Sequence, residues 1–160
     1  MGARFNQSGV TLVEVVIGIS IIATTLVAIG LSVNAYVDAR AVLLVNTKAV
    51  YLSEEGYEIV RAIRDMNWNT IDALPINTTR YLSVSTTTIA VTTTPEIIDG
   101  QFRRSFIVRS VYRSVTTDDI VTSSLPGATV DDGSRKIEIS VSGPHGTSTF
   151  EAILTNLFAI

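Results

Sequence analysis

The sequence predicts an α+β fold, in which one long N-terminal helix packs on a C-terminal antiparallel sheet of three to four strands. Three observations lead to this prediction. No proline occurs before Pro75, the run from Val15 to Val37 carries no charge, and residues 101–158 contain segments of alternating polar and apolar side chains. A chain of 160 residues has the size of one domain, with or without an appended segment.

The uncharged run is long enough to cross a membrane. Its 23 residues would span roughly 34 Å as a helix, against roughly 30 Å for the hydrocarbon core. A cleavable secretory signal has an apolar region of only about 7–15 residues. The polar leader before the run holds a single basic residue, Arg4. By themselves, these features indicate one transmembrane helix, spanning residues 10–37, that anchors an exported domain.

After the span, the helical pattern becomes one-sided over residues 38–66. Apolar residues recur at alternating spacings of three and four, which predicts a heptad-like stripe on one face. The stripe comprises Val42, Val45, Ala49, Leu52, Gly56, Ile59, Ile63 and Met66. The charged residues Arg40, Lys48, Glu54, Glu58, Arg61 and Asp65 fall mostly on the other face. We therefore expect one helix from about Thr11 to about Met66, whose second half needs a packing partner.

Residues 67–100 are expected to form a variable connection. The short runs 81–84 and 89–91 are rich in threonine and branched residues, which suit strands, so they predict one weak strand or hairpin. Trp68 is expected to pack where the helix meets the sheet.

Residues 101–160 are expected to form the sheet, as an antiparallel meander. The predicted strands are 103–115, 136–142 and 147–157, with turn material at 123–133 and a hairpin turn at 143–146. The first strand is dominated by Phe106, Val108, Val111 and Tyr112, and the side chains expected to face inward on the other two are Ile137, Ile139, Val141, Phe150, Ala152 and Leu154. A sheet with one apolar face needs a cover, and the stripe on the helix has the required length.

The composition offers little support for catalysis. The absence of cysteine excludes disulfides and thiolate metal sites. The single histidine, His145, lies in a Gly-Pro-His-Gly turn, without a second histidine to complete a zinc site. No nucleophile–base set, phosphate loop or cofactor motif is recognisable. We therefore expect a protein that is not an enzyme and that has no cofactor and no metal site.

Three groups of charged residues could in principle form a binding site. Asp99, Asp118, Asp119, Asp131 and Asp132 could bind calcium, but their spacing is not that of an EF-hand. Glu54, Glu55 and Glu58 are expected to form a solvated helix face. The arginines Arg103, Arg104, Arg109 and Arg113 could contact DNA, although a polar outer face or subunit contacts are the favoured interpretation. Acidic residues (15) exceed basic ones (12), which is not the footprint of a dedicated nucleic-acid binder.

Residues 9–14 read Gly-Val-Thr-Leu-Val-Glu, and they place the carboxylate of Glu14 in the first turn of an apolar helix. A charge at the centre of a membrane span costs about 2.5–3.5 kcal/mol on insertion scales, and such residues are usually functional. The stretch resembles the prepilin signature of the type IV pilin and pseudopilin family: a polar leader ending in glycine, a hydrophobic residue, Thr, Leu, any residue, and Glu. Val10 departs from the more usual phenylalanine or methionine. Stretches such as 51–56 also look like those of small, minor pilin-like proteins from ultra-small bacteria.

The resemblance implies processing. A prepilin peptidase would remove the leader, residues 1–9, by cutting between Gly9 and Val10, and would N-methylate Val10. The mature chain would then carry 11 basic and 15 acidic side chains, because Arg4 leaves with the leader.

The resemblance also implies assembly into a filament through Val10, Leu12, Glu14 and Gly18. The Val10 amine would be a cation at membrane depth, and Glu14 would pair with that amine on a neighbouring subunit. Alternatively, Glu14 stabilises its own helix start through the helix dipole. Gly18 and Gly30 would allow close helix packing, or are simply tolerated there.

The expected partners are copies of the chain or other pilins, the prepilin peptidase, an inner-membrane assembly platform, and membrane lipid before assembly. The precursor would cross the inner membrane once, with its N-terminus inside, and the mature chain would enter an extracellular or periplasmic filament. Two alternatives stay open: a minor tip subunit that binds DNA, a host or other surface, or secreted cargo, and a monomeric membrane-anchored domain.

Overall fold

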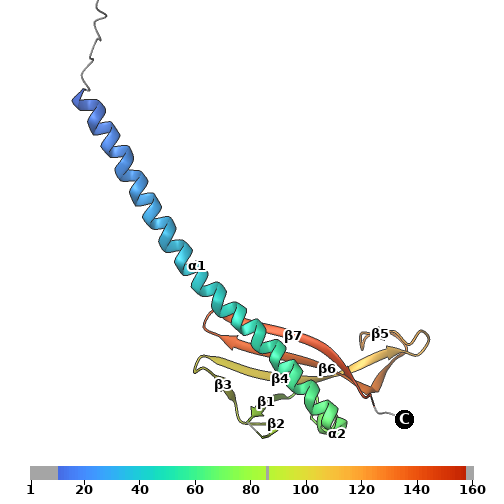
Figure 1. The fold of residues 1–160 in the computed structure, drawn as a ribbon. Helices are drawn as coiled ribbons and strands as arrows, with labels where there is room; N and C mark the ends of the chain where they lie inside the picture. The colour runs from blue at the N-terminus through green and yellow to red at the C-terminus, as the bar shows by residue number, and fades with distance from the viewer. Residues whose placement is uncertain (1–10, 86, 158–160) are drawn as a thin grey trace, which may run out of the picture. The chain divides into compact units, whose positions relative to one another are not determined.

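The computed structural model describes residues 11–85 and 87–157. They belong to two compact units, one ending at Val42 and the other beginning at Leu43. The elements are α1 (Leu12–Met66), α2 (Trp68–Asp72), β1 (Thr79–Val84), β2 (Ile89–Thr92), β3 (Glu96–Ile98), β4 (Phe102–Ser114), β5 (Ile120–Val121), β6 (Ala128–Gly143) and β7 (Gly146–Thr155) (Figure 1). The predicted α+β class is confirmed.

Helix α1 begins and ends within one residue of the predicted positions. Thr11 caps its start, because the backbone N–H of Glu14 donates to the Thr11 carbonyl oxygen at 3.0 Å and approaches its hydroxyl at 3.4 Å. At the other end Asn67 leaves the helical conformation, and its side chain accepts a hydrogen bond from the backbone of Asn69 to start α2. The uninterrupted helix follows from the absence of proline before Pro75.

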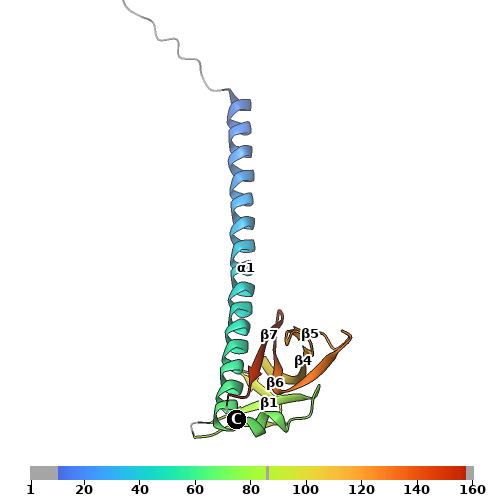
Figure 2. The same ribbon diagram turned by 90° about the vertical axis from the view of Figure 1, so that its right-hand side faces the viewer.

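In the second unit, α1 covers one face of the sheet (Figure 2). The buried helix residues are Ala49, Leu52, Ser53, Gly56, Val60, Ile63 and Arg64. The predicted stripe is confirmed at Ala49, Leu52, Gly56 and Ile63, which are all buried. It was wrong at its two ends, because Val42 is 37% exposed and Met66 is 65% exposed. The helix fully buries side chains against the sheet only between Ala49 and Arg64, so the regular apolar spacing extends beyond the surface that the sheet covers.

The sheet is antiparallel, with the order β2-β1-β4-β6-β7 and with β3 and β5 also paired to β4. The long strands β4, β6 and β7 are those predicted, and β1 with β2 forms the predicted hairpin. The described residues form seven strands rather than three or four. The additional β3 and β5 have only three and two residues, too few to produce a recognisable alternation in the sequence.

Strand β6 begins at Ala128, within the segment predicted to be turn material. Its pairing with β4 shifts where Ser110 opposes Arg135 and Val111 opposes Asp131. The polar residues 132–134 thus form a bulge inside one strand instead of a turn between two, and the Gly133 N–H donates to Asp131 Oδ1 at 2.9 Å. The turn prediction was correct in locating an irregularity and wrong about its type.

The core lies between α1 and the inner face of the sheet. One cluster joins helix residues Val60 and Ile63 to Ile71, Leu82, Phe106, Val108, Ile137, Ile139 and Leu154, and a second joins Ala49 and Leu52 to Phe102 and Val141. The predicted inward side chains of β6 are confirmed, Phe150 and Trp68 pack at the edge of the first cluster, and Ala152 is half-buried. Val111 is buried but belongs to neither cluster.

Gly56 marks the closest approach of α1 to the sheet. A Cβ atom at this position would lie 2.9 Å from Arg104 Cδ and 3.1 Å from Ile139 Cγ2. The Arg104 side chain cannot easily move aside, because its guanidinium is held by Glu96 and by the Leu52 carbonyl. Glycine is therefore required here by packing.

We predict that Gly56→Ala destabilises the second unit by about 1–2 kcal/mol. The overpacking penalty of about 1–3 kcal/mol is partly offset by the gain of up to about 1 kcal/mol in helix propensity. Chemical unfolding of the full chain in detergent, followed by Trp68 fluorescence, measures the difference. Gly30→Ala is the matched control, because a Cβ there meets nothing within 4 Å. Equal unfolding midpoints for Gly56→Ala and the unmodified chain would contradict the packing argument.

Candidate assembly site

The first unit exposes an almost wholly apolar helix surface. Its most hydrophobic window of 18 residues has a mean hydropathy of 2.5, and none of it is buried. Leu12 is 81% exposed and Leu31 is 67% exposed. The helix is long and apolar enough to cross a membrane. A helix that is apolar all round requires lipid or other helices around it.

The hydroxyl groups on this apolar segment are satisfied by their own helix. Ser20 donates to the Val16 carbonyl oxygen at 2.7 Å, and Ser32 donates to that of Ala28 at 2.9 Å. Thr24 and Thr25 donate in the same way to carbonyl oxygens one turn back. Since no water is available in hydrocarbon, these internal bonds make the polar side chains compatible with a membrane or with a bundle of helices.

Glu14 lies in the first turn of α1, and its side chain is exposed. Within residues 11–85 and 87–157, its carboxylate makes no hydrogen bond or ion pair. The predicted cleavage site between Gly9 and Val10, and with it the predicted counter-charge on the Val10 amine, lie outside the described residues. The position of Glu14 is compatible both with a partner on another subunit and with interaction with the dipole of its own helix.

Leu12 and Gly18 lie on the same open helix. A Cβ at Gly18 or at Gly30 would meet nothing within 4 Å, so the described chain does not require glycine at either position. This differs from Gly56, where packing within the chain explains the residue. The open space beside Gly18 and Gly30 allows another helix to approach closely.

In the second unit, the arginines of β4 differ in their surroundings. The side chain of Arg104 is 2% exposed and lies on the core face with Phe102 and Phe106. Its Nε and Nη2 donate to the two carboxylate oxygens of Glu96 at 2.8 and 2.7 Å. The prediction of a polar outer face was therefore wrong for Arg104. Burial lowers the pKa of its guanidinium, but the hydrogen bonds and charge of Glu96 outweigh burial and raise that pKa.

Arg109 and Arg113 are also neutralised by carboxylates. Arg109 Nε lies 2.7 Å from Glu138 Oε2, and the hydrogen bond raises the pKa of this guanidinium. Arg113 Nε lies 2.7 Å from Asp131 Oδ2, which raises the pKa of Arg113 and lowers that of Asp131. Arg103 is the β4 arginine without an ion pair to another described residue, and it lies over the Tyr81 ring at 5.8 Å. The strand therefore does not present the row of free cations expected of a DNA-binding surface.

The predicted carboxylates do not come together. Asp131 pairs with Arg113 and Asp99 pairs with Lys48, whereas Asp118 and Asp119 lie between β4 and β5. In the described ranges, no group of three or more His, Asp or Glu side chains is placed to hold a metal ion. His145 is exposed in the two-residue turn between β6 and β7. The three glutamates at 54, 55 and 58 are exposed on α1, and Glu55 lies 3.5 Å from Arg104.

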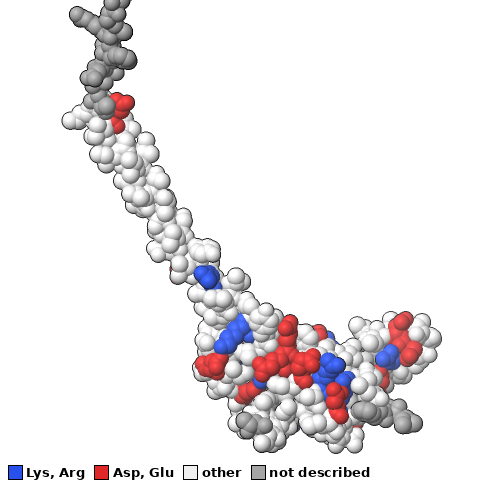
Figure 3. Space-filling model, viewed as in Figure 1, with Lys and Arg blue, Asp and Glu red and all other residues white. Residues whose placement is uncertain are grey.

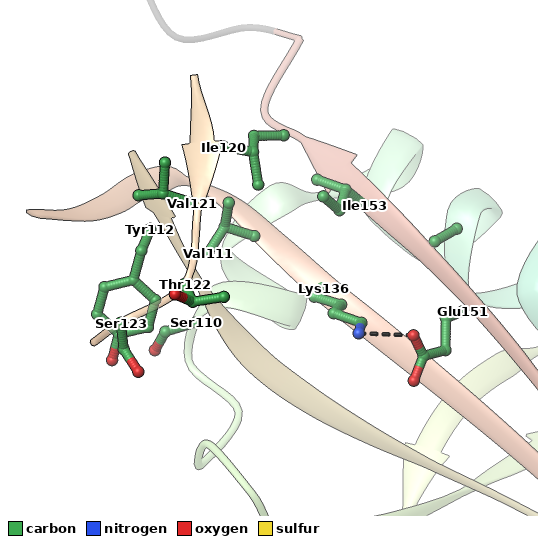
Figure 4. A pocket seen from close by; sticks show the side chains of 11 residues that line it. Ser110, Val111, Tyr112, Ile120, Val121, Thr122, Ser123, Lys136, Glu151 and Ile153 are labelled. Atoms are coloured by element: carbon green, nitrogen blue, oxygen red, sulfur yellow. Dashed lines mark ion pairs between the residues drawn. The ribbon is translucent and has the colours of Figure 1, made fainter. Parts of the chain in front are cut away.

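A pocket of about 470 Å³ lies beside the short strand β5 (Figure 4). No local sequence pattern predicts this pocket, because its lining comes from β4, β5, β6 and β7 and from the residues after β5. Val111, which is 3% exposed, belongs to its lining with Ile120 and Ile153. The ion pair between Lys136 Nζ and Glu151 Oε2 lies at one side, at 2.6 Å. The lining is thus mixed: apolar side chains lie beside the hydroxyl-bearing Ser110, Thr122 and Ser123 and beside one neutralised ion pair.

We predict that Glu96→Ala destabilises the second unit by about 3–5 kcal/mol, because it leaves the buried Arg104 charge without its main partner. Glu138→Ala is the matched control: it also removes the carboxylate from an Arg–Glu pair of the sheet, but Arg109 is 41% exposed. Its cost should be at most about 1 kcal/mol. Denaturant unfolding of both variants measures the two values, and similar losses would contradict the distinction between a buried and an exposed pair.

The comparisons with known proteins concern the N-terminus. Residues 4–30 match the family model described as the prokaryotic N-terminal methylation motif. No curated protein and no solved structure matches the chain. The matched range contains residues 4–9 of the predicted leader and the apolar start of α1, and it ends before the second unit.

Proposed function

We propose that this chain, which carries the leader signature of type IV pilins and pseudopilins, is the precursor of a structural subunit of a type IV pilus or a related pseudopilus. The precursor is held in the inner membrane by α1, is cleaved after Gly9 and is N-methylated on Val10. The mature chain then polymerises through its N-terminal helix into an extracellular or periplasmic filament. Its role is structural rather than enzymatic.

The single observation that carries the proposal is the coincidence of the motif with an exposed apolar helix. The motif covers residues 4–30, and the apolar window of α1 is not buried at all by the described chain. A processing signal alone would fit any membrane anchor. An apolar helix that can exchange lipid for neighbouring helices is also what polymerisation requires, because both surroundings bury the same surface.

The position of Glu14 gives this assembly a register. After cleavage, the Val10 amine is a cation four residues before Glu14. Within one helix the pair is awkward, because the amine points back along the axis, away from Glu14. Between two subunits that are staggered along their axes, the contact can be direct. A buried ion pair adds little net stability compared with apolar side chains of similar size. Removing one partner, however, leaves a buried charge unpaired and is strongly destabilising, so the pair can specify how the subunits align.

We predict that mass spectrometry of the protein from its native cells finds a chain that begins at Val10 with one additional methyl group. The physical reason for glycine before the cut is that a residue without a side chain lets an active site approach the backbone closely. Gly9→Val should therefore retain residues 1–9 and remain in the membrane fraction. A native chain that still carries its leader would contradict the proposal and favour a simple membrane anchor.

We predict that Glu14→Ala lowers the amount of subunit in sheared filaments at least about tenfold, because removal of one partner from a buried pair costs about 3–5 kcal/mol. Cleavage and methylation in the membrane fraction should be unchanged. Glu54→Ala is the matched control: Glu54 is also exposed on α1, and its carboxylate makes no ion pair to another described residue. Incorporation of Glu14→Ala at the unmodified level would show that Glu14 only stabilises its own helix.

A further inference from the structure

We propose that the second unit carries two complementary surfaces that join neighbouring copies end to end. The β3–β4 hairpin, residues 96–103, of one copy docks into the pocket beside β5 of the next copy. This inference rests on the proposed function as a filament subunit. It adds a contact between the globular parts to the contact between helices.

The hairpin presents an apolar side chain beside an unpaired cation. Ile97 is 66% exposed, and it lies opposite Arg103 across the two strands, so both side chains are on one face of the hairpin. The guanidinium of Arg103 makes no ion pair to any other described residue and lies over the Tyr81 ring. The turn is tight, with positive φ at Asp99 and Gly100, and Asp99 is held by Lys48. The hairpin is therefore a fixed projection with one apolar contact and one free charge.

The pocket offers the complementary pair of features. Val111 is buried in its lining, whereas Ile120 is 53% exposed and Ile153 is 38% exposed. Asp119 directly precedes Ile120, and no described residue pairs with its carboxylate. Figure 3 shows acidic side chains beside basic ones at the end of the sheet that carries β5, where Arg113 is already paired with Asp131. An exposed isoleucine thus fits the apolar part of the pocket, formed by Val111, Ile120 and Ile153, and a free guanidinium fits a free carboxylate.

The two surfaces cannot meet within one copy. The hairpin lies where β4 begins and the pocket lies where it ends, so β3 and β5 are at opposite ends of the sheet (Figure 1). The 13 residues of β4 separate them by about 40 Å at about 3.3 Å per residue. A contact between two different surfaces of identical chains is heterologous, and it repeats indefinitely unless its rotation closes a ring. Such a contact is suited to a filament.

The test uses engineered cysteines in the full chain, which has no cysteine of its own. Ile97→Cys and Ile120→Cys are produced as two variants in the same cells, and filaments are oxidised before electrophoresis. We expect disulfide-linked dimers only when both variants are present. One chain carrying both substitutions should give a ladder of dimers, trimers and longer species. In the matched control, Ile120→Cys is replaced by Val84→Cys, which is 51% exposed on β1 but remote from the pocket, and no ladder should form.

The charge pair is tested in the same assay. Arg103→Glu should lower the ladder yield by up to about fivefold, the range expected for an exposed ion pair, and Asp119→Arg in the same chain should restore it. Arg80→Glu, a second arginine without an ion pair to a described residue, should have no effect.

Intact filaments without the ladder would overturn the docking proposal and leave the proposed function standing. Absence of filaments that contain the unmodified chain would instead overturn the proposed function. Dimers formed by Ile97→Cys alone would reveal a symmetric contact, and cross-linking of Ile120→Cys only to a foreign protein would reveal another occupant; either result overturns the proposal.

Discussion

The apolar surface of α1 between Leu12 and Val37 is the constraint on which the rest of the molecule depends. Exposed apolar side chains lie on every side of this segment, so its burial in lipid or among other helices is strongly favoured over contact with water. In the proposed function, lipid would cover it before assembly and other helices would cover it afterwards, since both bury the same surface. The same constraint explains why the hydroxyls of Ser20, Thr25 and Ser32 bond to their own helix. It also sets Glu14 apart, because no described cation pairs with its carboxylate.

In the second unit, the same helix has one face buried against the sheet and one face exposed to solvent. From Ala49 onward α1 buries only one side, and the sheet presses against it closely enough to require glycine at position 56. The buried Arg104 crosses this interface, bonded to Glu96 of β3 and to the Leu52 carbonyl of α1. The close packing at Gly56 and the fixed partners of the buried guanidinium together favour one register of the helix on the sheet. The network therefore positions β3, and with it the hairpin that exposes Ile97.

Most of the fold could be predicted because the sequence patterns of α1 and of the long strands extend over many residues. The bounds of α1 follow from an uninterrupted pattern that ends at Asn67, and the inward residues of β6 follow from strict alternation. Arg104 could not be placed inside, because its burial depends on Glu96, whose strand has three residues and no pattern of its own. For the candidate site, the motif gave Gly9, Val10 and Glu14 by resemblance, but their contacts require a second subunit. The pocket beside β5 is formed by four strands, so no local stretch of sequence could indicate it.

The distribution of charge suits the two proposed assembly surfaces to different tasks. Contacts between apolar helices are strong but not directional, so they tolerate many alignments of neighbouring subunits. Specific alignment has to come from polar groups whose partners are missing within the chain. Arg104, Arg109 and Arg113 cannot serve, because carboxylates of the same chain already neutralise them. Glu14 at one end of α1 and Arg103 on the sheet do retain unpaired charge among the described residues. In a filament that used both contacts, Glu14 would align the helices and Arg103 would align the globular parts. Because the two parts belong to one chain, moving a subunit out of register at one contact would also break the other.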